Sequence, residues 1–141
     1  MRTLSLVFPM LAMVLLTFAV AVALFRARMR SVREGLVPIT YFRTFEGATE
    51  PEFLVKPTRH FINLFEAPVL FYAGCLAAMV TGATGPWAVV LAWGYVAARI
   101  VHAAIHLRSN RLRWRMRAYL VSWICLLALW VHVALHVVAT E

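Results

Sequence analysis

The sequence predicts an all-α integral membrane protein, a four-helix bundle that runs up-down-up-down with both termini on the outer side. Composition is the first reason, because 63% of the 141 residues are hydrophobic and only 14% are charged. A soluble domain of this size has too much surface to hide so many apolar side chains, whereas a bilayer accommodates them. The second reason is that the basic residues, which make the formal net charge +8, lie between apolar runs and form no basic domain. We therefore expect a lipid bilayer as partner and no nucleic acid.

Four apolar segments reach the length of about 20 residues that a helix needs to cross a bilayer. They make up a single transmembrane domain over residues 1–141, with helices expected at about 4–30, 58–80, 87–107 and 113–138. The first segment resembles a secretory signal peptide, but it is longer than the usual apolar region of one. It also ends in a cluster of arginines that is typical of a cytoplasmic flank, so we expect a retained helix.

The connections between these segments predict how the helices follow one another. Residues 81–86 include Gly82, Gly85 and Pro86, and this short run of helix breakers predicts that the second and third helices are antiparallel neighbours. The longest connection, residues 31–57, mixes glutamates, prolines and aromatic residues. We expect it to form an ordered cap or an interfacial segment.

The basic residues predict the orientation of the bundle. Residues 26–59 carry seven Lys or Arg and residues 108–117 carry five, whereas residues 81–86 carry none. Because cytoplasmic connections are enriched in Lys and Arg, both basic segments are expected to face the cytoplasm, which leaves both termini outside. The two basic segments fall on the same side only if the chain crosses the membrane four times.

Polar side chains recur at helical spacing within three of the four segments, although ionisable groups in hydrocarbon are costly and usually mark function. All three sets lie toward the cytoplasmic end of their segments. They are Arg59, Asn63 and Glu66 on the second, Tyr95, Arg99, His102 and His106 on the third, and Arg115, Tyr119 and Ser122 on the fourth. Together they predict a cationic pocket, open to the cytosol, that suits a small anionic ligand with hydrogen-bonding groups.

A purely structural explanation is available for two of these residues. At a rise of about 1.5 Å per residue, Glu66 lies about 10 Å inward from Arg59, and Arg99 lies about 12 Å inward from Leu107. An ion pair between Glu66 and Arg99 would therefore make both charges tolerable. It would not explain why Asn63 and the histidines converge at the same level.

Four histidines form two pairs with the i, i+4 spacing that metal sites use, His102 with His106 and His132 with His136. However, His132 is about 28 Å along the fourth helix from its start, so the two pairs lie near opposite faces of the membrane. They cannot share one metal, and we expect neither a metal nor a haem. His132 and His136 are assigned no role, and a haem or metal protein stays open as a minor alternative.

The segment Arg59-His60-Phe61-Ile62-Asn63-Leu64-Phe65-Glu66-Ala67-Pro68 resembles the Arg-x-x-x-Asn-x-x-Glu segment, followed by Pro, of the MAPEG family of membrane-associated proteins in eicosanoid and glutathione metabolism. Arg99 and His102 are similar to the Arg-x-x-His of the family's third helix. Arg115 and Tyr119 are similar to an Arg and a Tyr on its fourth. Arg26 is similar in placement to an arginine that contacts glutathione. The likeness spans nearly the whole chain and is closer to the bacterial branch.

The resemblance implies a homotrimer with glutathione as co-substrate, bound between neighbouring subunits at the cytoplasmic face of a bacterial inner membrane. It implies that Arg115 is catalytic and activates the thiol. The glutathione-binding residues would be Arg26, Arg59, Asn63, Glu66, Arg99, His102, His106 and Tyr119. The expected activity is that of a transferase or peroxidase acting on small apolar electrophiles.

Three positions depart from the family pattern. Ile62 stands where many eukaryotic members carry an Arg that contacts glutathione, and His106 stands where several have a Tyr. Met116 stands where the prostaglandin E synthase type has a Ser implicated in catalysis. A missing Arg weakens the binding of an anion. The alternative is therefore a non-catalytic membrane binding or assembly protein that keeps the fold.

Overall fold

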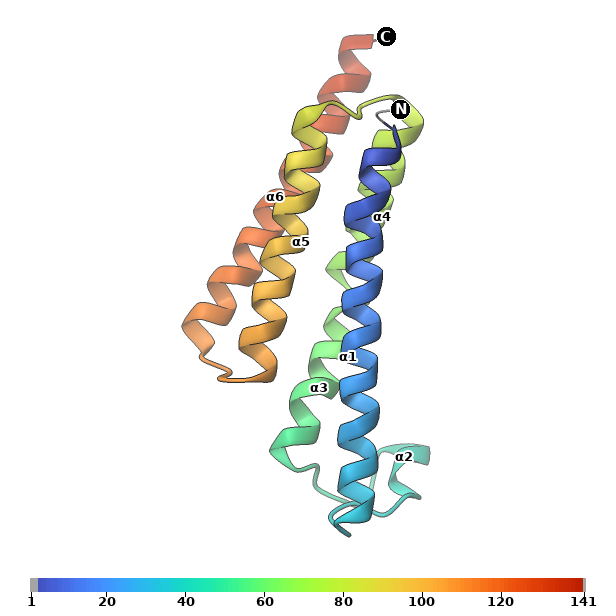
Figure 1. The fold of residues 1–141 in the computed structure, drawn as a ribbon, viewed down its shortest axis with the longest axis vertical. Coiled ribbons are helices and arrows are strands. Elements are labelled where there is room, and N and C mark those ends of the chain that lie inside the picture. The colour runs from blue at the N-terminus through green and yellow to red at the C-terminus, as the bar shows by residue number, and fades with distance from the viewer. Residues whose placement is uncertain (1–2, 141) are drawn as a thin grey trace.

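The computed structural model describes residues 3–140, and within them the chain forms helices and no strand (Figure 1). A short 3-10 helix, η1 (Thr3–Leu6), leads into the first of the α-helices. These are α1 (Val7–Arg33), α2 (Tyr41–Thr44), α3 (Glu52–Asn63), α4 (Ala67–Thr81), α5 (Pro86–Leu107) and α6 (Leu112–Thr140). Four segments are long and apolar enough to cross a membrane, with α3 and α4 together making the second of them. The predicted all-α, four-span fold is confirmed.

The long helices run alternately up and down, so the connections between them lie at the two ends of the bundle (Figure 1). The two ends of the chain and the α4–α5 connection lie at one end of the bundle, and α2 and the α5–α6 turn lie toward the other. Helix α6 packs against α5 and α4, while α1 packs against α3. Both basic segments therefore share one end of the bundle, as the four-span topology requires. Which end faces the cytoplasm stays a prediction.

The second membrane segment differs from the prediction of one helix over 58–80. It begins earlier, at Glu52, and is interrupted between Asn63 and Ala67. Pro68 explains the interruption, because proline has no N–H to donate to the carbonyl of Leu64 and its ring would collide with that carbonyl in a continuous helix. The tighter bonds from Leu64 N to Phe61 O (3.1 Å) and from Phe65 N to Ile62 O (2.9 Å) close α3 instead. The spacing had predicted that Asn63 and Glu66 share one helical face. This prediction is wrong, because the helix is interrupted between them.

Close packing of small residues holds the helices of the bundle together. A Cβ added to Gly94 on α5 would lie 3.2 Å from Cys125 Sγ on α6, and one added to Gly74 on α4 would lie 3.2 Å from Trp130 Nε1 on α6. Small residues at helix contacts are typical of membrane bundles, where association depends on packing and not on escape from water. Cys75 and Cys125 are free thiols, the first buried and the second half-buried.

The connection after α1 is ordered around a small apolar core of its own. Val37 and Tyr41 are buried against Leu24 of α1 and Leu54 of α3. The guanidinium of Arg28 lies 5.3 Å from the centre of the Phe42 ring, a favourable cation–π distance. This segment forms a cap on the basic end of the α1–α3 pair.

Candidate functional site

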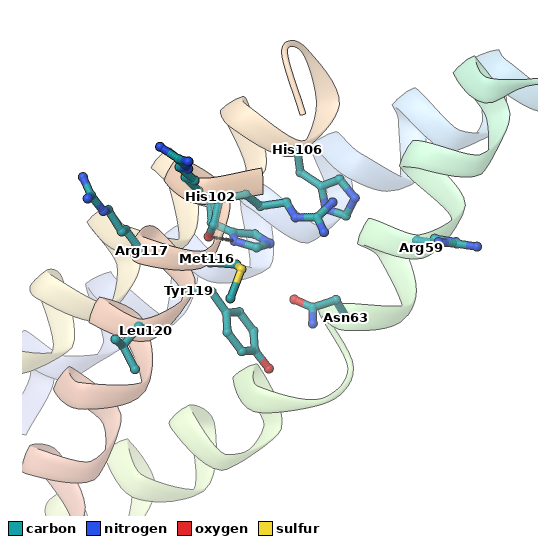
Figure 2. A pocket seen from close by; sticks show the side chains of 10 residues that line it. Arg59, Asn63, His102, His106, Met116, Arg117, Tyr119 and Leu120 are labelled. Carbon is teal, nitrogen blue, oxygen red and sulfur yellow. Dashed lines mark hydrogen bonds between the residues drawn. The ribbon is translucent and has the colours of Figure 1, made fainter. Parts of the chain in front are cut away.

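A cavity of about 660 Å³ lies between α3 and the basic end of the α5–α6 pair (Figure 2). Figure 2 shows Tyr119 of α6 and Asn63 of α3 facing each other across it. Eight of its ten lining residues are cationic or polar, and the other two are apolar. The lining residues are Arg59, Asn63, His102, His106, Arg113, Arg115, Met116, Arg117, Tyr119 and Leu120. Four of them are arginines and none is acidic, so the cavity suits an anion.

The α5–α6 turn positions Arg115 at the edge of this cavity. Asn110 takes a positive φ of 46°, a left-handed conformation that asparagine adopts more readily than most residues. Its Oδ1 accepts a hydrogen bond from Arg115 Nη1 at 2.6 Å. The backbone carbonyl of Arg115 accepts a bond from His102 Nδ1 at 3.1 Å. The turn thus holds one edge of the guanidinium and joins α6 to α5 beside the cavity.

Arg99 is the largest fully buried side chain of the described residues, at 0% exposure. Its Nη2 donates to Asn63 Oδ1 at 2.6 Å and to the Asn63 carbonyl at 3.3 Å. Asn63 Nδ2 in turn donates to Glu66 Oε2 at 3.1 Å. Hydrogen bonds therefore connect Arg99 to Asn63 and Asn63 to Glu66, with the Asn63 amide between the two charged groups.

The direct Glu66–Arg99 ion pair considered from the sequence is absent from the described residues. The ion pairs found there are Arg30–Glu34 and Lys56–Glu52. The helix break places Glu66 on the surface, so Asn63 is the group that reaches Arg99. Arg99 Nε and Nη1 are buried without a hydrogen-bond partner, and Arg99 lies 5.8 Å from the centre of the Tyr119 ring.

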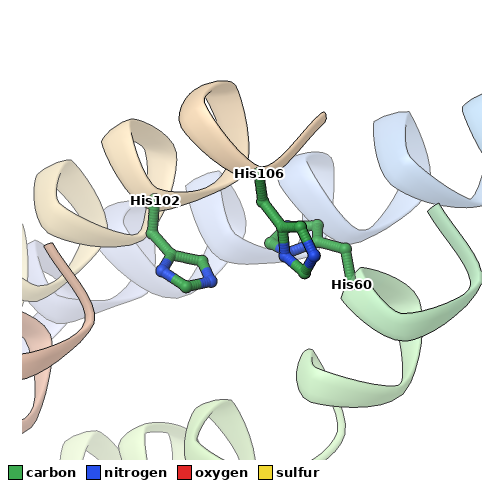
Figure 3. Close-up of side chains that lie close together, drawn as sticks. All are labelled: His60, His102 and His106. Carbon is green, nitrogen blue, oxygen red and sulfur yellow. The ribbon is translucent and has the colours of Figure 1, made fainter. Parts of the chain in front are cut away.

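A third histidine joins the pair on α5. His60 of α3 lies beside His102 and His106, with ring centres 5.5 Å and 5.1 Å away (Figure 3). A role for His60 was not predicted from the sequence. The i, i+3, i+6 spacing of Leu54, Pro57 and His60 is visible in the sequence and is typical of one side of a helix. These three are the buried residues of α3.

The predicted site residues separate into three groups. Those that line the cavity are Arg59, Asn63, His102, His106, Arg115 and Tyr119. Arg99 and Glu66 adjoin it through Asn63. Arg26 does not belong to this cavity, because it lines a separate hollow of about 350 Å³ along the end of α1. The cavity also takes in Arg113, Arg117 and Leu120, which the sequence analysis placed only in a basic segment or an apolar run.

The sequence matches the MAPEG family over residues 6–135. The chain belongs to the MAPEG family. This MAPEG protein is therefore a membrane protein of a family associated with glutathione and eicosanoid metabolism, and the lipid bilayer is its surroundings. No curated protein and no solved structure matches the chain.

The cavity of this MAPEG protein combines two kinds of surface. Guanidinium groups and histidine, asparagine and tyrosine side chains can bind carboxylates and peptide groups through charge-assisted and neutral hydrogen bonds. Met116 and Leu120, both exposed on α6, add an apolar side next to Arg115. Such a cavity can hold a polar anionic ligand against an apolar one.

Proposed function

We propose that this protein is a membrane-bound, glutathione-dependent transferase or peroxidase that acts on small apolar electrophiles. The observation that carries this proposal is the cavity with four arginines and no acidic lining residue, in a chain of the MAPEG family. Glutathione has two carboxylates, an ammonium group and a thiol, so it needs both cationic and hydrogen-bonding partners. An apolar electrophile can reach the same place through the lipid that surrounds the helices.

Arg115 is the residue proposed to activate the thiol. A free thiol has a pKa of about 8.5 and is mostly protonated at neutral pH, and an adjacent guanidinium favours the thiolate. Because Asn110 holds Arg115 Nη1, the guanidinium is oriented before the ligand arrives. Met116 lines the cavity beside it and offers an apolar contact for the electrophile.

The remaining lining residues are proposed to bind the peptide. Arg59 supplies a cation for a carboxylate, while Asn63, His102, His106 and Tyr119 supply hydrogen bonds. Glu66, which is exposed and bonded to Asn63, is available for the ammonium group. Arg99 acts through Asn63, because its own Nη2 is bonded to that side chain.

Arg26 supports a site shared between subunits. It is exposed and lines its own hollow on α1, away from the cavity on α3, α5 and α6. In a homotrimer, an α1 helix from a neighbouring subunit would bring its Arg26 to glutathione bound at the cavity. We propose that assembly, with the basic end facing the cytoplasm across a bacterial inner membrane.

The second candidate function is a non-catalytic membrane binding or assembly protein that keeps the fold. Ile62 favours it, since this side chain is 57% exposed, does not line the cavity and adds no charge for an anion. Met116 favours it as well, because it occupies the cavity wall without a hydroxyl group. Both candidates predict a bound small molecule or partner, but only the first predicts an activated thiol.

The test is ultraviolet difference spectroscopy of the detergent-purified protein titrated with glutathione at neutral pH. We expect a saturable thiolate signal that falls about tenfold or more in Arg115→Ala. Without the guanidinium the pKa of the bound thiol should rise by about one unit or more, and each unit costs the thiolate about 1.36 kcal/mol, a factor of ten. Arg111→Ala is the matched control, since Arg111 is an exposed arginine of the same turn that does not line the cavity.

Two outcomes would count against the proposal. If glutathione produced no thiolate signal and no rise in the thermal midpoint, the transferase function would be wrong and the non-catalytic candidate favoured. If the signal persisted in Arg115→Ala, glutathione would be activated by another group.

A further inference from the structure

Three imidazole rings meet where α3 packs against α5, and each offers a ligand nitrogen (Figure 3). These nitrogen atoms of His60, His102 and His106 all lie within 4.8 Å of one another. Neutral imidazole is the most frequent protein ligand for transition metals. With Zn–N bonds of about 2.0–2.1 Å, two nitrogens on one tetrahedral ion lie about 3.3 Å apart. His60 Nδ1 and His106 Nδ1 are 3.2 Å apart, so this pair already has the spacing of two ligands.

His60 lacks the partners that a buried imidazole usually has. It is 0% exposed, its Nδ1 faces only the nitrogen of His106, and its Nε2 has no partner among the described residues. A hydrogen bond between two rings satisfies one nitrogen of each at most, and buried polar groups left unsatisfied are uncommon. A cation held between the two Nδ1 atoms would replace the close contact between these two nitrogens.

His102 is held in the orientation that metal-binding histidines usually have. Its Nδ1 bonds the carbonyl of Arg115 at 3.1 Å, and a carbonyl oxygen only accepts, so this nitrogen carries the proton. The other nitrogen, Nε2, therefore keeps its lone pair. A backbone carbonyl that fixes the tautomer in this way is the usual outer-shell partner of a histidine ligand.

Hydrogen bonds connect α3 to α5 beside the three rings. His102 and His106 are one turn apart on α5, the spacing of paired histidine ligands on a helix. The bonds from Arg99 to Asn63 hold the end of α3 against α5, so His60 is held beside them. The ligand nitrogen of His102 lies within 4.8 Å of those of His60 and His106.

We propose that His60, His102 and His106 form a three-histidine site for a divalent transition metal of the Zn²⁺ class. Three nitrogen ligands favour Zn²⁺, Cu²⁺ or Ni²⁺ over Mg²⁺ or Ca²⁺, which prefer oxygen. Because His102 and His106 also line the cavity, the remaining coordination position faces the cavity. Arg99 and Arg115 lie nearby, so an anion such as hydroxide or a thiolate is the expected fourth ligand. With the ion bound, His102 would contact that ligand through the metal and not by a hydrogen bond of its own. The expectation that no metal binds rested on pairs that did not include His60.

The test uses untagged, chelator-treated protein in detergent without glutathione, titrated with Co²⁺ and then with Zn²⁺. We expect saturable visible absorption from tetrahedral Co²⁺ at one ion per chain, lost when Zn²⁺ displaces it. His60→Gln and His106→Gln should each bind at least about tenfold more weakly, because loss of even an outer-shell partner weakens metal affinity about 10–100-fold. His136→Gln, on the half-buried pair at the far end of α6, is the control and should bind normally.

Each outcome decides the proposal. Helical circular dichroism and size-exclusion profiles identify a variant that does not fold, and the other substitution then carries the comparison. No saturable binding to the parent protein overturns the site, which would then be a packed histidine cluster. Binding that is unchanged in His60→Gln and His106→Gln overturns it too, since the ion would lie elsewhere. Neither result bears on glutathione, because none is present.

Discussion

Asn63 is the residue that links the buried charge of the bundle to its surface. It accepts a bond from Arg99 Nη2 and donates one to Glu66 Oε2. A buried guanidinium is costly unless it is paired, and here a neutral amide at the end of α3 accepts from its Nη2. This residue therefore has a structural task, holding Arg99, and a proposed binding task at the cavity.

The structural task of Asn63 predicts a difference between two substitutions. Asn63→Ala removes the side-chain acceptor from Arg99, and we expect a loss of about 1.5–3 kcal/mol, the contribution of a hydrogen bond to a charged group. Asn63→Asp keeps an acceptor at the same place and should retain most of the stability. Thermal unfolding of the detergent-purified variants measures this. A parent-like midpoint for Asn63→Ala would show that the bond contributes nothing.

The break between α3 and α4 is the element that sets where Asn63 and Glu66 lie relative to each other. Without it, the second membrane segment would be a continuous helix and would present Asn63 and Glu66 on one face. With it, α3 brings His60 inward, leaves Glu66 exposed and aims Asn63 at Arg99. Pro68, near the start of α4, cannot donate the backbone bond that a continuous helix would need there, whereas Pro57 lies inside α3 without ending it.

Pro68→Ala restores the missing N–H, so we expect residues 64–68 to become partly helical. Hydrogen exchange in that stretch should slow by about fivefold, because a new backbone bond adds about 1 kcal/mol against local opening. Stabilisation by glutathione should weaken at the same time, since Asn63 and Glu66 would move. Pro9→Ala is the control, because Pro9 lies in the first turn of α1 where proline is tolerated. Unchanged exchange at 64–68 would mean that Pro68 does not cause the break.

At the scale of the whole molecule, the bundle has an apolar surface along its helices and a basic end. Large apolar side chains are exposed along its helices, for example Phe18, Val80 and Leu127, and lipid or neighbouring subunits must cover them. The basic segments, residues 26–59 and 108–117, lie toward the end of the bundle opposite the termini (Figure 1). A single chain also leaves Arg26 away from the cavity, so the proposed glutathione site needs a second subunit to be complete.

The orientation of the bundle is testable with a membrane-impermeant thiol reagent. Ser109→Cys places an exposed thiol in the α5–α6 turn, and Thr140→Cys places one at the end of α6. We expect Thr140→Cys to react in intact cells and Ser109→Cys to react only after the membrane is opened. The parent protein, with Cys75 and Cys125 inside the spans, sets the background. The reverse pattern would place the cavity on the outer side.

Much of the fold could be predicted because it depends on the hydropathy and the length of segments of consecutive residues. Helix length and hydropathy define four spans, and the spacing of His102, His106, Arg115 and Tyr119 places each pair on one side of its helix. The structure places these four residues around one cavity. Their roles toward glutathione stay predictions.

The sequence by itself determined the class of the protein, the number of spans and the polar side of the third and fourth helices, because these are local properties. Only the tertiary structure decided which polar groups meet. It paired Arg99 with Asn63 and not with Glu66, it brought His60 to the α5 histidines, and it left Arg26 apart. The physical reason is that the rotation of one helix against another depends on close contacts such as that of Gly94 with Cys125, which residues far apart in the chain must make together.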